Sequence, residues 1–173
     1  GTNIIVENLF YNMPVRRKFL KSDRSESLAI RDVVKKIAIA NPNVGFKLYE
    51  NDKLKINYIK LKSANRVETS LEERVRAVLG QDFFAASISL NINSNNFSIK
   101  GYISIPTYNK PNWNDSIIVI NNRIIKDRLL FGAIKAAYSG VLAGGRFPVI
   151  AIFIDTNPNN LDINVHPTKS EVR

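Results

Sequence analysis

Apolar residues recur at helical spacing in three segments of the chain. In residues 25–40 they return every three or four positions, and Asn41-Pro42 predicts the end of that helix. Residues 70–73 read Ser-Leu-Glu-Glu, the pattern of a capping box. In this motif the serine and glutamate side chains each accept a hydrogen bond from a free backbone amide, so a second helix is predicted to begin at Ser70. Gly80 suits its C-terminal end. A third helix is predicted to begin at Lys126 or Asp127 and to end at Tyr138.

Alternating or continuous apolar runs separate these helices and predict strands. Asparagine and aspartate tolerate the positive φ of tight turns, so Asn51-Asp52 and Asn121-Asn122 predict two hairpins. The predicted strands are 4–10, 44–50, 53–62, 88–92, 97–105, 117–120, 124–125, 147–154 and 161–165. The continuously apolar run 147–154 is typical of a strand covered on both faces. Together these elements predict an α+β fold of mixed or antiparallel sheets with helices on one face.

Composition and charge narrow the chemistry. The 173 residues contain no cysteine, which excludes disulfides and thiolate chemistry, and one histidine, which excludes metal sites that need several histidines. No signal peptide and no membrane-spanning run is present, so a soluble protein is expected. The net charge of +10 indicates a polyanionic partner, either a nucleic-acid backbone or an anionic membrane surface.

The positive charge is concentrated in two clusters. The first lies in residues 16–24, where Phe19 and Leu20 interrupt five basic residues and anchor them on one surface. The second consists of Arg123, Lys126 and Arg128, directly after the predicted 121–122 hairpin. Either cluster alone fits an ordinary solvated surface, but both on a chain at +10 favour binding to a nucleic-acid backbone.

Two other patterns are interpreted as connections. The glycine-rich loop at residues 140–145 lacks the following Lys-Ser/Thr of a phosphate cradle, so it is interpreted as a helix-to-strand connection. Asp155, Asn157 and Asn159 match the first spacings of a calcium loop, but Pro158 intrudes and the required turn glycine and final glutamate are missing. A turn is the better interpretation, and no metal site is expected. Trp113 is interpreted as a loop-packing residue.

Three segments of the chain carry recognisable motifs. The chain ends in DINVHPTKSEVR, which is similar to the motif DVNVHPAKxEVR of the MutL family of mismatch-repair ATPases, a member of the GHKL group. It begins with GTNIIVENLFYNMPVRRKFLK, similar to GTxVxVxxLFxNxPARRKFL, and IVINNRIIKDRLL resembles the family's VNGR hairpin and helix. The departures are Val15, Asn122 and Thr168, and Asn122 keeps the positive-φ tolerance of the turn. The match spans essentially the whole chain.

The resemblance implies roles for particular residues. Lys169 would reach the γ-phosphate of ATP, and Thr2 would lie near the adenine. Lys18, Lys21 and Arg128 would contact DNA. No catalytic residue is expected within the chain, so it would be inactive alone, whereas the full-length protein would be a weak ATPase that uses ATP and magnesium. None of these cofactors is expected to be bound to this piece alone.

The resemblance also implies a domain organisation. Residues 1–62 would form the rear part of the GHKL ATPase domain, so that the chain begins midway through it, and residues 63–173 the transducer domain, with a ribosomal-protein-like fold and a left-handed βαβ crossover. The expected partners are DNA, bound without sequence specificity, a second copy in the ATP state, and a mismatch-recognition protein of the MutS type. No membrane partner is expected, and the location would be the bacterial cytoplasm, associated with the nucleoid.

Two alternatives stay open. The chain could be the corresponding region of a type II topoisomerase ATPase subunit, which shares a Thr-Lys loop like Thr168-Lys169 but lacks the NVHP run and the PxRRKFL segment. It could also be a basic nucleic-acid-binding module, whose DNA affinity would ignore ATP.

Overall fold

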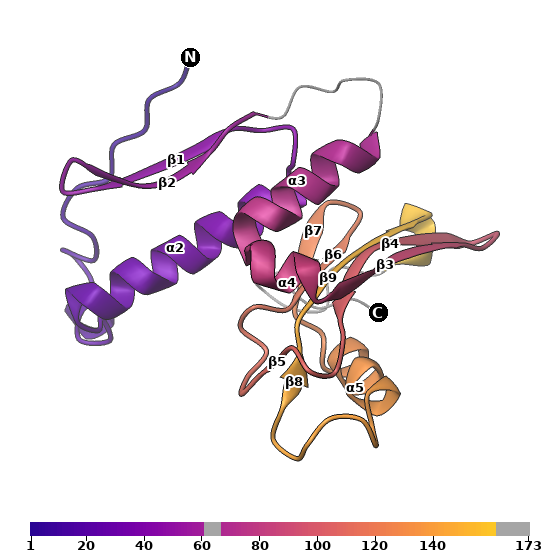
Figure 1. The fold of residues 1–173 in the computed structure, drawn as a ribbon. Helices are drawn as coiled ribbons and strands as arrows, with labels where there is room; N and C mark the ends of the chain where they lie inside the picture. The colour runs from indigo at the N-terminus through magenta and orange to yellow at the C-terminus, as the bar shows by residue number, and fades with distance from the viewer. Residues whose placement is uncertain (61–66, 162–173) are drawn as a thin grey trace. The chain divides into compact units, whose positions relative to one another are not determined.

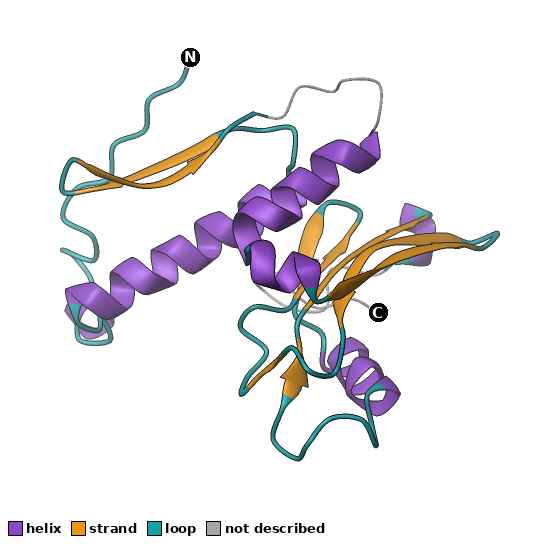
Figure 2. Ribbon diagram, viewed as in Figure 1, coloured by secondary structure: helices purple, strands orange, loops and turns teal. Residues whose placement is uncertain are grey.

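The computed structural model describes residues 1–60 and 67–161, which Figures 1 and 2 trace by position and by secondary structure. The chain divides into two compact units, Gly1–Val33 and Val34–Arg173. The domain boundary expected at residues 62–63 lies outside the described residues. None of the helices in the described ranges has the length and apolarity needed to cross a membrane.

The first unit contains α1 (Pro14–Arg17) and the beginning of α2 (Asp23–Ala40). The strand predicted at residues 4–10 is wrong, because no segment of the described chain pairs with it. A strand needs a neighbour for its backbone hydrogen bonds, and Ile4 is 81% exposed. The predicted helix 25–40 is confirmed as α2, which begins two residues earlier with Asp23 and Glu26 in its first turn.

The second unit begins with the end of α2 and continues into a hairpin of β1 (Phe46–Glu50) and β2 (Lys53–Tyr58). Asn51 and Asp52 have φ values of 48° and 61°, as the type I′ turn requires. The hairpin was predicted correctly, with both strands shorter at their outer ends; positions 61 and 62 of the second predicted strand lie outside the described residues.

Helix α3 (Val67–Leu79) begins three residues before the predicted cap. Ser70 is therefore not the N-cap: it lies within the helix and is buried at 6% exposure. A Ser-x-x-Glu pattern also suits a helix interior whose serine faces the core, which is why it was misleading here. Gly80 ends α3 at φ 92°, as predicted, and leads into α4 (Gln81–Ala85), too short to show a periodic pattern.

A five-stranded sheet organises the rest of the second unit. Its members, in order across the sheet, are β3 (Ser87–Asn93), β4 (Phe97–Ser104), β9 (Ile150–Thr156), β6 (Ile117–Ile120) and β7 (Arg123–Ile125). β6 and β9 are parallel, and the other neighbours are antiparallel. The connection from β6 to β9 contains β7 and α5 (Arg128–Ala137), so a βαβ unit is present; its left-handedness stays a prediction.

A smaller sheet pairs β5 (Asn109–Lys110) with β8 (Phe147–Pro148). The single strand predicted over 147–154 is therefore two strands in different sheets. Pro148 explains the break, because proline has no amide to donate to a continuing ladder. After β9 the chain forms a 3-10 turn, η1 (Pro158–Asn160). Most of the last predicted strand, residues 162–165, lies outside the described residues.

The sheet is covered on both faces. Alternate residues of β6 point to opposite sides: Ile117 and Val119 join a core with α2, α3 and α4, while Ile118 and Ile120 join one with α5. All four are buried. The α+β class with mixed sheets is confirmed, but the helices lie on both faces of the sheet instead of one, because a continuously apolar strand needs cover on each side.

Candidate nucleic-acid interface

A tight turn fixes the start of the second basic cluster. Asn121 and Asn122 have φ values of 46° and 64°, which closes the β6–β7 hairpin as predicted. The Asn121 side chain also ties this turn to the end of β9, since its Nδ2 donates to the Thr156 carbonyl (2.9 Å) and its Oδ1 accepts from the Thr156 amide (3.0 Å). Arg123, the first residue of β7, is consequently held exposed beside an anchored turn.

A helix cap fixes the end of the cluster. The Asp127 carboxylate accepts hydrogen bonds from the amides of Leu129 (2.9 Å) and Leu130 (3.0 Å), two of the donors left free at the start of a helix. Arg128 is therefore the first residue of α5, and it is exposed. Ile125 anchors the segment in the core at 1% exposure, and Lys126 extends from it into solvent.

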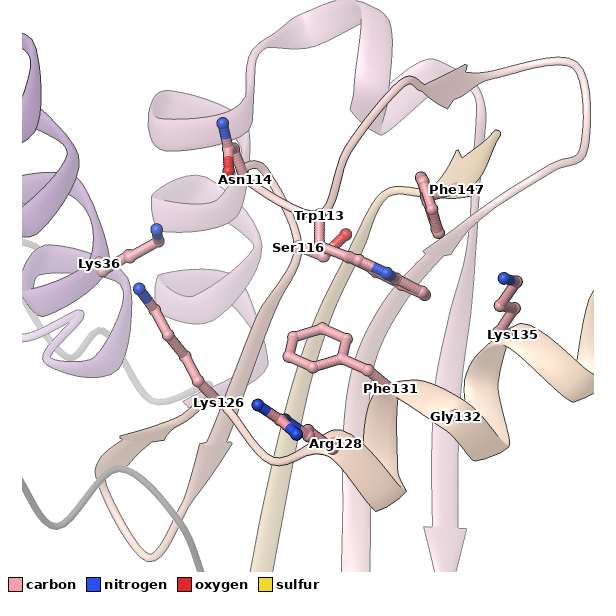
Figure 3. A pocket seen from close by; sticks show the side chains of 10 residues that line it. All are labelled: Lys36, Trp113, Asn114, Ser116, Lys126, Arg128, Phe131, Gly132, Lys135 and Phe147. Carbon is pink, nitrogen blue, oxygen red and sulfur yellow. The ribbon is translucent and has the colours of Figure 1, made fainter. Parts of the chain in front are cut away.

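Four positively charged side chains line one cavity of about 410 Å³. They are Lys36 of α2, Lys126, and Arg128 and Lys135 of α5, as Figure 3 shows. Arg128 and Lys135 are two helical turns apart and therefore share a face. Among the described residues that line this cavity, none has an acidic side chain. The rim therefore favours an anion.

Aromatic rings form one wall of the same cavity. The Trp113 ring lies 4.7 Å from that of Phe131 and 4.9 Å from that of Phe147, measured between centroids. The Lys135 ammonium lies 5.5 Å from the centroid of Phe147. Below them Ser116 is buried, and its hydroxyl donates to the Pro148 carbonyl at 2.8 Å. The expectation that Trp113 packs its loop is confirmed, and the packing also builds a cavity wall.

The remaining predicted site residues belong to the first unit or lie outside the described residues. Lys18 ends α1 and Lys21 follows it; both are exposed in the first unit. The Lys21 amide donates to the Glu26 carboxylate at 2.8 Å, which fixes the backbone before α2. Thr2 is exposed in the same unit. Lys169 and Thr168 lie outside the described residues. Of the predicted residues, the structure thus brings Lys126 and Arg128 to one cavity.

Lys36 and Lys135 were not predicted as part of this site. Lys135 carries a usable signal, because it follows Arg128 by seven residues on a helix and so shares its face. Lys36 carries no such signal, since it is far from the cluster in sequence and reaches the cavity only through the packing of α2.

Both patterns that were interpreted as connections form connecting segments in the structure. The glycine-rich segment 140–145 joins α5 to β8. Asn157 accepts a hydrogen bond from the Asn159 amide at 3.0 Å and caps the 3-10 turn η1. Across residues 1–60 and 67–161, no group of three or more His, Asp and Glu side chains is arranged to hold a metal ion.

Comparison with known proteins places this geometry in a family. The model for "DNA mismatch repair protein, C-terminal domain" matches residues 75–173, more than half of the chain. The DNA mismatch repair protein MutL of Rickettsia akari is 45% identical over 174 residues, which covers the whole chain but 28% of that protein. The chain therefore spans little more than a quarter of the length of this relative.

Two solved structures show the same fold. A structure described as the N-terminal domain of a DNA repair protein superposes with a TM-score of 0.77 at 17% identity, over 95% of this chain and 51% of that one. The Aquifex aeolicus MutL ATPase domain complexed with ADP superposes with a TM-score of 0.62 at 23% identity, over 87% of this chain and 51% of that one. With the family match, these similarities establish that the chain belongs to the MutL family of DNA mismatch repair proteins.

Proposed function

We propose that this chain is the part of a MutL-type ATPase that links the nucleotide state of the protein to its grip on DNA. The observation that carries the proposal is a cavity with four basic side chains at its rim and no acidic one in its described lining, within a chain of the mismatch-repair family. The four are Lys36, Lys126, Arg128 and Lys135. Ammonium and guanidinium groups neutralise phosphates without reading the base sequence. The DNA contact is therefore to the backbone, with Lys18 and Lys21 as a second group of contacts in the first unit.

The nucleotide contacts in this proposal come from Lys169 and Thr2. An ammonium is a compact charge suited to the terminal phosphate of ATP, and it loses that partner when the γ-phosphate leaves. A threonine hydroxyl can hydrogen-bond a purine edge. The Aquifex aeolicus relative was solved with ADP, which supports nucleotide binding in the full-length protein. Magnesium would screen the phosphates there.

The wider assembly follows from the same proposal. Residues 1–62 complete the rear of an ATPase domain and 63–173 act as its transducer. The apolar residues exposed in the first unit, among them Ile4, Ile5, Val6 and Phe19, suit burial against further protein. Dimerisation with ATP and recruitment by a MutS-type mismatch-recognition protein complete the cycle.

The DNA contact is tested by the salt dependence of duplex binding. Each phosphate neutralised adds about 0.9 to the slope of log affinity against log salt. We expect the double variant Lys126→Ala with Arg128→Ala to lose affinity and to lower this slope by roughly 2. Lys55→Ala, at an exposed position on β2, is the matched control and should leave the slope unchanged. An unchanged slope in the double variant would refute these contacts.

The nucleotide link is tested in the full-length protein. DNA affinity is measured with and without a non-hydrolysable ATP analogue, in the natural protein and in Lys169→Ala. We expect the analogue to change the affinity of the natural protein and to have little effect in the variant. A DNA affinity that ignores the analogue in both proteins would favour the simpler alternative, a basic nucleic-acid-binding module.

A further inference from the structure

We propose that the cavity between α5 and the 113–116 loop accepts one unpaired nucleotide of a single-stranded nucleic acid. The base would enter against Phe131 and Trp113, and the flanking phosphates would lie at Lys126 and Arg128 on the rim (Figure 3). This inference rests on the proposed DNA contact and narrows it, from any phosphate backbone to a strand whose bases are free to leave the stack.

The size and the aromatic lining of the cavity suit a planar ligand. Its volume of about 410 Å³ lies in the range of roughly 300–1,000 Å³ typical of small-molecule sites. One wall is aromatic, and proteins that hold single strands without sequence preference combine such rings with a positively charged groove. The Asn114 amide adds a hydrogen-bonding group beside the rings, whereas the Ser116 hydroxyl already donates to Pro148.

Gly132 leaves the α5 side of the cavity without a side chain. It lies on α5 between Arg128 and Lys135, on the face that lines the cavity, and a Cβ placed there would have no heavy atom within 4 Å. Its backbone is helical, and its φ lies outside the left-handed region, so no turn demands a glycine. Glycine inside a helix is less favourable than alanine. The helix therefore carries an unfavourable residue at a position that lines the cavity.

A duplex cannot use the aromatic wall. Its bases are stacked and paired, and exposing one costs a few kcal/mol, so a duplex meets only the cations at the rim. An acidic peptide likewise satisfies the cations but leaves the rings without a planar partner. The combination of rings and cations therefore favours a single-stranded nucleic acid over both.

Trp113 is the only tryptophan of the chain and reports occupancy directly. We expect oligo(dT) to quench its fluorescence saturably at low salt, and a duplex carrying the same number of phosphates to bind with little quenching. Gly132→Leu, which places a bulky side chain in the cavity lining, should abolish the quenching and weaken oligo(dT) binding roughly tenfold, the loss expected for one base–aromatic stack. Duplex affinity should change less than twofold.

Ala133→Leu is the matched control, since it adds the same side chain at the next, exposed position of α5 and lines no cavity wall. It should behave like the natural protein. The proposal is overturned if Gly132→Leu quenches and binds oligo(dT) as the natural protein does, or if poly-glutamate quenches Trp113 as strongly as oligo(dT). In either case the salt-dependent duplex binding of the proposed function could still stand. Failure of both DNA forms to bind at low salt would refute that function itself.

Discussion

Replacing Arg74 should destabilise the second unit more than replacing any surface residue. Arg74 is 1% exposed on α3 and reaches three backbone carbonyls with one nitrogen. Its Nη2 donates to Pro42 (2.9 Å), Val44 (2.7 Å) and Ile59 (2.9 Å), which lie on the two sides of the β1–β2 hairpin. A single side chain therefore joins α3 to the ends of that hairpin.

The magnitude follows from counting protons and acceptors. Nη2 carries two hydrogens, so two good bonds are shared among three carbonyls. A hydrogen bond from a charged group contributes about 1.5–3 kcal/mol, which gives roughly 3–6 kcal/mol in total. Burial of the guanidinium opposes this gain. Among the described residues, the Nε and Nη1 atoms are buried without a hydrogen-bond partner. Burial lowers the pKa of Arg74 below its ordinary value, an effect that the nearby Tyr58 only partly offsets.

Arg74→Met leaves the three carbonyls without these donors, although it also removes the desolvation cost of the guanidinium. We therefore expect Arg74→Met to lower the free energy of unfolding by about 3–5 kcal/mol, most of the value of the two charged hydrogen bonds that are lost. Arg74→Lys should lose less, about 1–2 kcal/mol. An ammonium has three protons for three carbonyls and leaves no unpaired nitrogen, but it is shorter.

The assay is urea unfolding followed by Trp113 fluorescence, which reports the unit that contains Arg74. With a slope of roughly 2 kcal/mol per molar urea, Arg74→Met should lower the midpoint by about 2 M. Arg76→Met is the matched control on the same helix. Its ion pair with Glu72 (2.8 Å) is exposed, and its cation–π contact is to Phe84, so about 1 kcal/mol is expected.

Two outcomes would refute this reasoning. If Arg74→Met shifts the midpoint no more than Arg76→Met does, the three carbonyls find other donors and Arg74 is not what holds α3 to the hairpin. If Arg74→Lys is as unstable as Arg74→Met, the shape of the guanidinium and its contact with the Tyr58 ring (5.5 Å) matter more than the donated protons.

Three further predictions concern the sheet, the cap and one buried phenol. Gly101→Ala should destabilise the protein by more than about 3 kcal/mol, because a Cβ there would lie 2.0 Å from the Ala151 carbonyl oxygen at a φ of 141°; thermal unfolding measures it. Asp127→Ala should cost about 1 kcal/mol through loss of the α5 cap, while Asp127→Asn retains most of it in the same melt. Burial raises the pKa of the Tyr138 hydroxyl above its ordinary 10.0, more than a side-chain hydrogen bond with Ser104 lowers it. The native state thus favours the neutral phenol, so its contribution to stability is complete below pH 10 and is lost as the pH rises through the native pKa. Tyr138→Phe should flatten the alkaline decline of the unfolding midpoint, and an unchanged decline would contradict this sign.

Local chemistry made much of the fold predictable. The hairpins at Asn51-Asp52 and Asn121-Asn122, the helix capped by Asp127 and the end of α2 before Asn41-Pro42 are each encoded in adjacent residues. The failures are cases in which a distant segment decides. Residues 4–10 have strand character but no strand partner in the described chain, and the apolar run 147–154 is divided between two sheets at Pro148.

Only the local part of the candidate site could be predicted from the sequence. Arg123, Lys126 and Arg128 lie within six residues of one another and were therefore recognised as a cluster, and the resemblance to MutL gave Arg128 a role. The cavity itself could not be predicted, because it requires Trp113 to pack between Phe131 and Phe147 and requires α2 to bring Lys36 to the rim. Gly132 becomes meaningful only once the helix face that it opens is known.

If the proposed function holds, we expect a structural link between its nucleotide contact and its DNA contact to pass through Asn121. Strand β9 lies between β4 and β6 and leads, through η1, toward the segment that contains Lys169. At the end of β9, Thr156 exchanges two hydrogen bonds with the Asn121 side chain, and Asn121 opens the turn that presents Arg123, Lys126 and Arg128. We therefore expect a displacement of the chain beyond Thr156 to change the position of the turn that presents the basic cluster.

This link predicts that the full-length Asn121→Ala protein still binds DNA but responds less to an ATP analogue. The two lost hydrogen bonds are worth about 2 kcal/mol together, comparable with a typical coupling free energy of about 1–3 kcal/mol. Asn122→Ala is the matched control, since it loses the same positive-φ tolerance (64° against 46°) but neither bond to Thr156. If both variants respond to the analogue less than the natural protein does, and to the same extent, strain in the turn and not the Thr156 contact is responsible. If neither differs from the natural protein, the coupling takes another route, because a contact worth about 2 kcal/mol on that route would have to change the response when removed.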